Sequence, residues 1–454
     1  MTLLTYTTRR ILTVLSLVAT LTVARSQDVP TGVPTDMPHA HARAMFPEEL
    51  YRNAQSQLPA SFDVMPSPTT TGAPFNVVYG WYPYWTSSTA TTTMRPNLLT
   101  HIAWFSVGVD TATGALGSLD AWKNTQVVTW AKSKGLKVHL TITCFGNKEL
   151  TALLSSPAKR ARCIAEITAA VALRSADGVN IDFESLPASQ RSAMVAFMQA
   201  LRKAMPLKEL TIATPSVDWN KSWDLAALSS ICDFLILMGY DYYWSGSSTA
   251  GPVAPLRGET YNVSKSIDAH LNAGVEPSRL VVAVPLYGRT WTVSTTARKA
   301  DVVSGTTSAT PTYSSSHNLQ RFSSRTHDET TSVSWFNNQD GTIINQTWID
   351  DSLSLDAKYR HVKGSGLRGV GFWALGYDGG RTSMWDGLQS MTTSTCIRDG
   401  AAEITVAADD QQVEIFTLLG QRVFSGARRD VPSARLPSGV YLEFDGRRSV
   451  IIQR

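Results

Sequence analysis

Eight short apolar runs, separated by segments with helical spacing, constrain the fold of this chain most strongly. The runs are almost continuously apolar, which is typical of strands that are covered on both faces in a parallel sheet. They are Phe75–Tyr84, Leu98–Val109, Leu136–Phe145, Gly178–Phe183, Leu210–Val217, Phe234–Tyr240, Leu280–Leu286 and Leu367–Leu375. Ser189–Met205, just after Pro187, is one of the helical stretches between them. The pattern predicts an α/β fold, a closed (β/α)8 TIM barrel over residues 75–391.

The connection before the last run is far longer than a usual crossover in such a barrel. It extends from Trp291 to Leu367. We expect a small β-rich insertion between strands seven and eight, at about residues 292–348. Val333–Trp348 would supply its strands, with a hairpin turn at Asn337–Gly341.

The first residues have the layout of a cleavable secretory signal, which we place at residues 1–26. Arg9 and Arg10 precede the apolar stretch Ile11–Val23, and small residues follow at Ala24 and Ser26. The apolar stretch is shorter than the ~20 residues of a typical membrane span, so we expect an exported protein without one. An uncleaved membrane anchor is the alternative. Residues 27–74, rich in Pro, Ser and Thr, are predicted to be a linker.

Residues 392–454 are predicted to form a small, separate all-β domain. Polar and apolar residues alternate over Val413–Phe424, with a turn expected at Gly420. Two further candidate strands follow at Leu436–Glu443 and Ser449–Ile452. This segment resembles the C-terminal sorting domain of the Bacteroidetes type IX secretion system. The resemblance implies a secretion machinery as partner and a location outside the cell or on its surface. A small carbohydrate-binding module is the competing interpretation, although the segment has no Trp on which a sugar could stack.

Charge and cysteine content exclude several classes of protein. The 454 residues carry a net charge of only +4, without a Lys/Arg run among aromatic residues, so we expect no nucleic-acid partner. None of Cys144, Cys163, Cys232 and Cys396 lies in a CxxC pair, which argues against a zinc ribbon or a thioredoxin site. Export permits disulfides, but the spacing selects no pairing, and buried free thiols remain open. We expect no metal, no cofactor and a monomer.

The fourth apolar run, Asp177–Glu184, carries the most informative polar residues. Side chains alternate along a strand, so Asn180, Asp182 and Glu184 share one face, and the apolar residues between them share the other. The apolar face suits the helix layer, and the polar face must then point into the barrel, where isolated charges are costly. Active sites of such barrels lie where the strands end. The alternative is a purely structural polar layer.

These residues and four other motifs resemble glycoside hydrolase family 18, the chitinase-like enzymes. Asp177, Asp182 and Glu184 fit the family signature DxxDxDxE, whereas Asn180 stands where the commonest pattern has Asp. The other matching segments are Gly80–Trp85, Met238–Asp241, Val284–Arg289 and Phe372–Asp378, which contains Trp373. All five lie at expected strand tips in the order of the family, and the resemblance covers about residues 75–391.

The resemblance implies a role for each matching residue. Glu184 would be the general acid, and Asp182 would favour its protonated form and orient the substrate's N-acetyl group, which serves as the nucleophile in this family. Tyr240 would donate a hydrogen bond to the acetamido group, Asp241 would bind sugar or water, and Trp373 would be the floor beneath the sugar. The other predicted substrate-binding residues are Asn180, Met238, Tyr82, Trp85 and Trp219.

The function implied by the resemblance is that of a secreted retaining glycosidase. Its substrate would be a polysaccharide or oligosaccharide of β-1,4-linked N-acetylglucosamine, such as chitin. Peptidoglycan and the core of N-linked glycans are alternative substrates, and endo or exo action stays open. A non-catalytic sugar-binding protein on the same barrel is the alternative from another class. Lectins of the family commonly lose the final Glu, and Glu184 is present.

Overall fold

The computed structural model describes residues 75–393, 412–417, 422–427, 440–444 and 449–453. The predicted signal peptide, the predicted linker and Cys396 lie outside these described residues. The chain divides into two units, Met1–Ser394 and Thr395–Arg454, which are described separately below.

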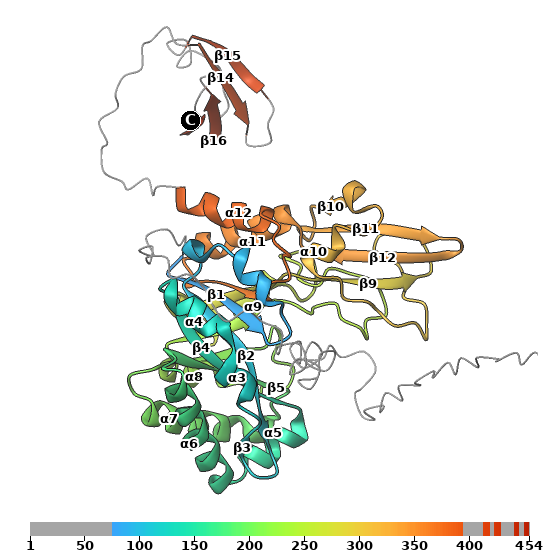
Figure 1. The fold of residues 1–454 in the computed structure, drawn as a ribbon. Helices are drawn as coiled ribbons and strands as arrows, with labels where there is room; N and C mark the ends of the chain where they lie inside the picture. The colour runs from blue at the N-terminus through green and yellow to red at the C-terminus, as the bar shows by residue number, and fades with distance from the viewer. Residues whose placement is uncertain (1–74, 394–411, 418–421, 428–439, 445–448, 454) are drawn as a thin grey trace, which may run out of the picture. The chain divides into compact units, whose positions relative to one another are not determined.

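Eight parallel strands close into a barrel in the first unit (Figure 1). The strands are β1 (Val77–Pro83), β2 (His101–Asp110), β4 (Lys137–Phe145), β5 (Gly178–Glu184), β6 (Glu209–Thr214), β7 (Phe234–Met238), β8 (Leu280–Pro285) and β13 (Gly369–Trp373). Their order is β1-β13-β8-β7-β6-β5-β4-β2, and β1 also pairs with β2, so the sheet has no open edge. Each strand overlaps one predicted apolar run, and the predicted (β/α)8 barrel is confirmed.

Helices connect and cover most of these strands. They are α3 (Asp120–Asn124), α4 (Gln126–Ser133), α5 (Asn147–Leu154), α6 (Pro157–Leu173), α7 (Arg191–Ala204), α8 (Leu225–Ile231), α9 (Val263–Asn272), α11 (Ser352–Gly364) and α12 (Ser383–Thr393). The chain passes from β1 to β2 through the 3-10 turns Ser88–Thr92 and Pro96–Leu98, and the short strand β3 (Ala115–Leu116) folds back on β2. Helix α7 lies within the predicted Ser189–Met205 and buries an apolar stripe that includes Phe197 and Leu201.

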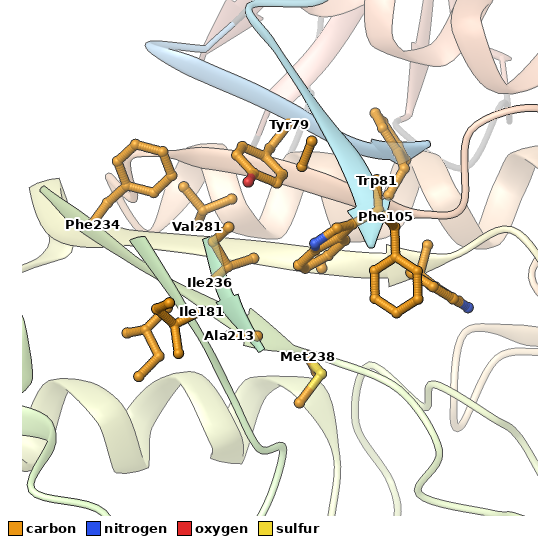
Figure 2. Packing of buried hydrophobic residues seen from close by; sticks show 14 of the residues in the cluster. Tyr79, Trp81, Phe105, Ile181, Ala213, Phe234, Ile236, Met238 and Val281 are labelled. Carbon is orange, nitrogen blue, oxygen red and sulfur yellow. The ribbon is translucent and has the colours of Figure 1, made fainter. Parts of the chain in front are cut away.

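Aromatic and aliphatic side chains fill the inside of the barrel (Figure 2). Tyr79 and Trp81 of β1 meet edge to face with their ring centroids 5.4 Å apart. Phe234 of β7 lies 6.0 Å from the ring of Tyr79. The barrel is therefore a packed core rather than a channel, and chemistry is confined to its two ends.

A four-stranded antiparallel sheet is inserted between β8 and β13. It consists of β9 (Gly288–Val293), β10 (Thr326–Asp328), β11 (Val333–Asp340) and β12 (Ile343–Ile349), in the order β10-β11-β12-β9, and the short helix α10 (Tyr313–Ser316) lies between β9 and β10. Because β9 starts almost directly after β8, the sheet begins earlier than the predicted residue 292.

The predicted hairpin turn at Asn337–Gly341 is wrong in position. Asp340 pairs with Ile343, so only Gly341 and Thr342 form the turn, and Asn337 is a strand residue opposite Gln346. Polar residues are tolerated in this strand because its far half is partly exposed. Gly341 adopts φ +58°, which glycine reaches without strain.

The described residues of the second unit form an antiparallel sheet by themselves. It contains β14 (Gln412–Thr417), β15 (Arg422–Ala427), β16 (Val440–Phe444) and β17 (Ser449–Gln453), in the order β15-β14-β16-β17. The predicted turn at Gly420 lies outside the described residues.

Cys144, Cys163 and Cys232 are buried free thiols. Burial raises the pKa of each thiol, that of Cys163 to about 12, so all three stay protonated and unreactive near neutral pH. Among the described helices, none has the length and apolar character needed to cross a membrane.

Candidate active site

Strand β5 carries Asn180, Asp182 and Glu184 on one face, and all three are at most 1% exposed. Phe183 points the other way and contacts Phe197 of α7, with ring centroids 5.5 Å apart. This alternation is what the sequence predicted. Glu184 is the last residue of the strand, so its carboxyl group lies at the carboxyl end of the barrel, where barrel enzymes carry their chemistry.

The backbone around Glu184 is held in place on both sides. The Gly146 N–H donates a hydrogen bond of 3.0 Å to the Glu184 carbonyl oxygen, which ties the end of β5 to the loop after β4. Ser185 follows in a left-handed conformation, at φ 64°, which costs free energy for a residue with a side chain. The chain therefore turns sharply directly after Glu184.

Asn180 lies one pleat below Asp182, and both ends of its amide are hydrogen-bonded. The indole N–H of Trp81 donates to Asn180 Oδ1 at 3.0 Å. Asn180 Nδ2 donates to Thr211 Oγ1, also at 3.0 Å. These two partners fix the orientation of the amide, which cannot exchange a proton with Asp182 as a carboxyl group could.

Tyr240 stands next to the carboxyl groups. It follows β7, whose last residue, Met238, lies in the barrel core (Figure 2). Burial raises the pKa of Tyr240 well above its usual value near 10, and the charges of Asp182, Glu184 and Asp241 raise this pKa further. Tyr240 is therefore a hydroxyl donor at neutral pH, within electrostatic reach of all three carboxyl groups.

Asp241 is held by two residues whose roles the sequence did not predict. The Tyr287 hydroxyl donates a hydrogen bond of 2.6 Å to Asp241 Oδ1, and the Arg289 guanidinium lies 3.9 Å from the same oxygen. Burial and Asp241 together raise the pKa of Tyr287 well above its usual value, so its hydroxyl stays a donor. Both residues belong to the Val284–Arg289 motif, which was the available signal.

Trp373 ends β13 and is braced by aromatic rings. Its ring centroid lies 4.7 Å from that of Phe105, 6.0 Å from that of Trp81 and 6.3 Å from that of Trp85, each in an edge-on arrangement. Trp85 is half-buried, and its indole N–H donates to the Tyr377 hydroxyl at 3.2 Å. The structure thus brings Trp85 to Trp373 at the carboxyl end of the barrel.

Tyr82 lies on the face of β1 opposite to that of Trp81. It pairs in register with Trp104, whose ring contacts Trp122 of α3 on the outer face of the barrel. Tyr82 shares that face because its neighbour Trp81 points inward. Its hydroxyl donates to the Ser87 carbonyl oxygen at 3.0 Å. The structure thus places Tyr82 near the end of β1, on its outer face.

Trp219 lies in the loop after β6, which also follows the carboxyl end of a strand. It is half-buried, and its ring centroid is 4.5 Å from that of Tyr261, a residue 44% exposed. The two rings form an aromatic pair that is partly open to solvent.

Asp182, Glu184 and Tyr240 lie at the carboxyl end of the closed barrel, the end at which barrel enzymes carry their chemistry. The family model for glycosyl hydrolases family 18 matches residues 77–378, and the chain belongs to this family.

Individual relatives are distant. A putative sporulation-specific glycosylase, YdhD of Bacillus subtilis, is 25% identical over 52% of this chain and 56% of its own length. Probable chitinase 2 of Drosophila melanogaster is 27% identical over 46% of this chain and 49% of its own. The chain thus spans about half the length of these curated relatives. A family 18 chitinase from Cycas revoluta, solved with a trimer of N-acetylglucosamine, superposes with a TM-score of 0.62 at 21% identity, over 69% of this chain and 99% of that one, and shows the same fold.

Proposed function

We propose that this protein is a retaining glycosidase that hydrolyses β-1,4-linked N-acetylglucosamine glycans with the substrate's own acetamido group as nucleophile. The observation that carries the proposal is the pair Asp182 and Glu184 on successive inward positions of β5, with Tyr240 beside both. Family membership supports this assignment, because substrate-assisted hydrolysis is known for this class of glycosidase.

In the first step, Glu184 donates its proton to the glycosidic oxygen as the bond from that oxygen to the anomeric carbon breaks. The acetamido carbonyl oxygen attacks the anomeric carbon and forms an oxazolinium ion. Asp182 accepts a hydrogen bond from the acetamido N–H and balances the positive charge. Tyr240 donates a hydrogen bond to the acetamido oxygen, which its raised pKa permits at neutral pH.

In the second step, Glu184 takes a proton from water, and the water oxygen attacks the anomeric carbon as the oxazolinium ring opens. Two inversions at one carbon give net retention. Trp373 supplies the apolar surface beneath the sugar, since its ring is fixed by Phe105 and Trp81. Tyr287 and Arg289 hold Asp241 for a contact with sugar or water.

Two remaining groups extend the proposed binding site. Trp85 contacts Trp373 and lengthens the aromatic surface, whereas Met238 is a buried residue of the barrel core. The half-buried ring of Trp219, paired with Tyr261, offers a second stacking surface for a neighbouring sugar. We give Tyr82 no contact with substrate, because it lies on the outer face of β1.

Chitin and its oligomers are the preferred substrates in this proposal. Relatives named as chitinases and as a di-N-acetylchitobiase support a chitin-type substrate. Peptidoglycan is the second candidate, favoured by relatives named as a sporulation-specific glycosylase and as cortical fragment-lytic enzymes. Hydrolysis of chitin oligomers and of peptidoglycan, compared by product analysis, separates the two.

We further propose that the protein is exported by its signal peptide and sorted to the exterior by the C-terminal unit. The sequence resemblance of residues 392–454 supports this proposal, and the antiparallel strands β14–β17 are compatible with it.

Replacing Glu184 by Gln tests the assignment of the acid. The amide keeps the shape of the side chain but cannot donate a carboxylic proton, so we expect turnover on N-acetylglucosamine oligomers to fall roughly 1,000-fold or more. Binding of these oligomers, measured by calorimetry, should persist. Glu276→Gln is the matched control, since Glu276 is exposed at the start of the turn that leads into β8. Near wild-type turnover of the Glu184→Gln protein would remove Glu184 from this role.

A further inference from the structure

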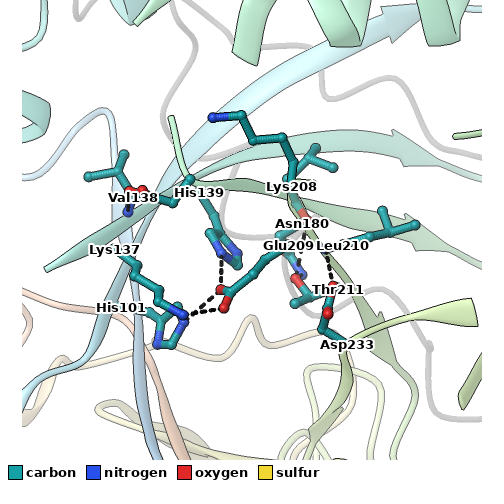
Figure 3. Close-up of polar contacts among 12 residues, drawn as sticks. His101, Lys137, Val138, His139, Asn180, Lys208, Glu209, Leu210, Thr211 and Asp233 are labelled. Atoms are coloured by element: carbon teal, nitrogen blue, oxygen red, sulfur yellow. Dashed lines mark hydrogen bonds and ion pairs between the residues drawn. The ribbon is translucent and has the colours of Figure 1, made fainter. Parts of the chain in front are cut away.

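Three side chains of types that can ligate a metal ion converge at the amino end of the barrel, opposite to the proposed active site. His101 begins β2, His139 lies near the start of β4 and Glu209 begins β6 (Figure 3). One ligand atom from each of them lies within 4.8 Å of the other two. The proposed mechanism uses none of these residues.

The two imidazoles point at a single carboxylate oxygen. His101 Nε2 and His139 Nε2 each lie 2.9 Å from Glu209 Oε2. A tetrahedral zinc ion about 2.0–2.1 Å from each ligand would separate such atoms by about 3.3 Å. Small side-chain shifts would therefore open the cluster enough to admit the ion.

The other nitrogen of each imidazole is held in position by a hydroxyl group. His101 Nδ1 lies 2.6 Å from Thr100 Oγ1, and His139 Nδ1 lies 3.3 Å from the Tyr79 hydroxyl oxygen. Such partners orient the rings of metal-binding histidines and set which nitrogen faces the metal.

A nearby cation competes for the carboxylate but does not close the site. Lys137 forms an ion pair with the other oxygen, Glu209 Oε1, and leaves Oε2 to the imidazoles. The Lys137 side chain is 52% exposed, so its ammonium group can move into water. The Glu209 side chain is 21% exposed, which allows a water molecule to serve as a fourth ligand.

We propose that His101, His139 and Glu209 bind one divalent zinc ion, which links strands β2, β4 and β6 at the amino end of the barrel. Two imidazoles and one carboxylate form a ligand set that suits zinc better than calcium or magnesium, which prefer oxygen ligands alone. The ion would stabilise the fold, since three strands that are far apart in sequence would share it. The sequence predicted no metal, because the three ligands form no short motif: the first, His101, and the last, Glu209, are 108 residues apart.

The test uses the full chain without an affinity tag, stripped of metal with a chelator. We expect calorimetric titration with Zn²⁺ to give one saturable site, and Zn²⁺ to raise the thermal midpoint by several degrees. Co²⁺ in place of zinc should give the visible absorption of a tetrahedral site. No strong near-ultraviolet thiolate band should accompany it, because the three proposed ligands include no cysteine.

Variants assign the site to these residues. Glu209→Gln and His101→Gln should each weaken zinc binding roughly 100-fold, and Tyr79→Phe, which removes only a supporting hydroxyl, roughly 10-fold. His317→Gln, directly after α10 in the insertion between β8 and β13, is the matched control and should bind zinc like the wild type. Absence of a saturable site in the wild type, or unchanged affinity in Glu209→Gln and His101→Gln, would overturn the proposal. If His101→Gln fails to fold, Glu209→Gln and the Co²⁺ spectrum still decide it.

Discussion

A neutral amide one pleat below Asp182 gives this site its own electrostatic character. Asn180 donates to Thr211 and accepts from Trp81, and it keeps the same charge at every pH. Where the commonest family pattern has a carboxyl group, a proton could be shared between two neighbouring positions. In this chain Asp182 and Glu184 remain as the only carboxyl pair on the inward face of β5.

Replacing Asn180 by Asp should therefore change how activity depends on pH. Three carboxyl groups on one strand face cannot all ionise cheaply, so they would titrate as a coupled set, and the pKa of at least one would rise. We expect the pH profile of kcat/KM on a short N-acetylated substrate to change shape relative to the wild type. Asn272→Asp, at the exposed end of α9, is the control and should leave the profile unchanged. Superimposable profiles for Asn180→Asp would show that position 180 is electrically remote from the acid.

At the scale of single elements, helix α9 is tied to the barrel by a buried histidine. His270 Nδ1 donates to the Ser266 carbonyl oxygen at 2.8 Å, and His270 Nε2 lies 2.9 Å from Thr214 Oγ1 at the end of β6. Burial lowers the pKa of His270 to about 4, outweighing the hydrogen bond to Ser266 and the charge of Asp218, which raise it. The imidazole is thus neutral wherever the protein is folded at ordinary pH.

This histidine makes the fold less stable in acid. Below pH 6.5 the unfolded chain binds a proton at His270, whereas the folded protein does so only near pH 4. The free energy of unfolding should therefore fall as the pH drops from 6.5 to 4, by up to about 3 kcal/mol from this group. His270→Gln should flatten this loss in urea unfolding measured across that range. His327→Gln, at a half-buried site in β10, is the control, and parallel wild-type and His270→Gln curves would contradict the assignment.

The elements show why sequence reasoning succeeded on β5 and failed on other segments. Strand β5 is buried on both faces, so a single alternation of polar and apolar residues has only one stable orientation. The hairpin β11–β12 is partly exposed, so its strands accept both polar and apolar residues. Composition alone therefore does not show where the strand ends and the turn begins. For Tyr82, the motif match gave its position along β1 but not the face that its side chain occupies.

At the scale of the whole molecule, contacts between distant strands were the least predictable features. Tyr287 and Arg289 meet Asp241 because the chain turns from β8 into the inserted sheet, and no spacing in the sequence encodes that turn. The cluster of His101, His139 and Glu209 exists only because β2, β4 and β6 are brought together in a closed barrel. Local patterns identify strands, whereas such side-chain clusters depend on how the barrel closes.

The division into two units predicts that the barrel is active without the C-terminal strands. A chain ending at Ser394 keeps all of the proposed catalytic residues and the barrel core. We expect this truncated protein, purified, to hydrolyse chitin oligomers within about two-fold of the full chain. In its native host it should accumulate in the periplasm instead of reaching the exterior. Loss of activity in the purified truncation would mean that the second unit helps to form the active enzyme.

The anomeric form of the first product tests the proposed chemistry most directly. A chitin oligomer is mixed with the enzyme, and proton NMR spectra are collected before the product can mutarotate. Attack by the acetamido group followed by attack by water gives retention, so the new reducing end should appear first as the β-anomer. An oligomer with glucosamine in place of N-acetylglucosamine at the cleaved position should resist hydrolysis. First appearance of the α-anomer, or equal cleavage of the de-acetylated oligomer, would contradict catalysis by the substrate's own acetamido group at Asp182 and Glu184.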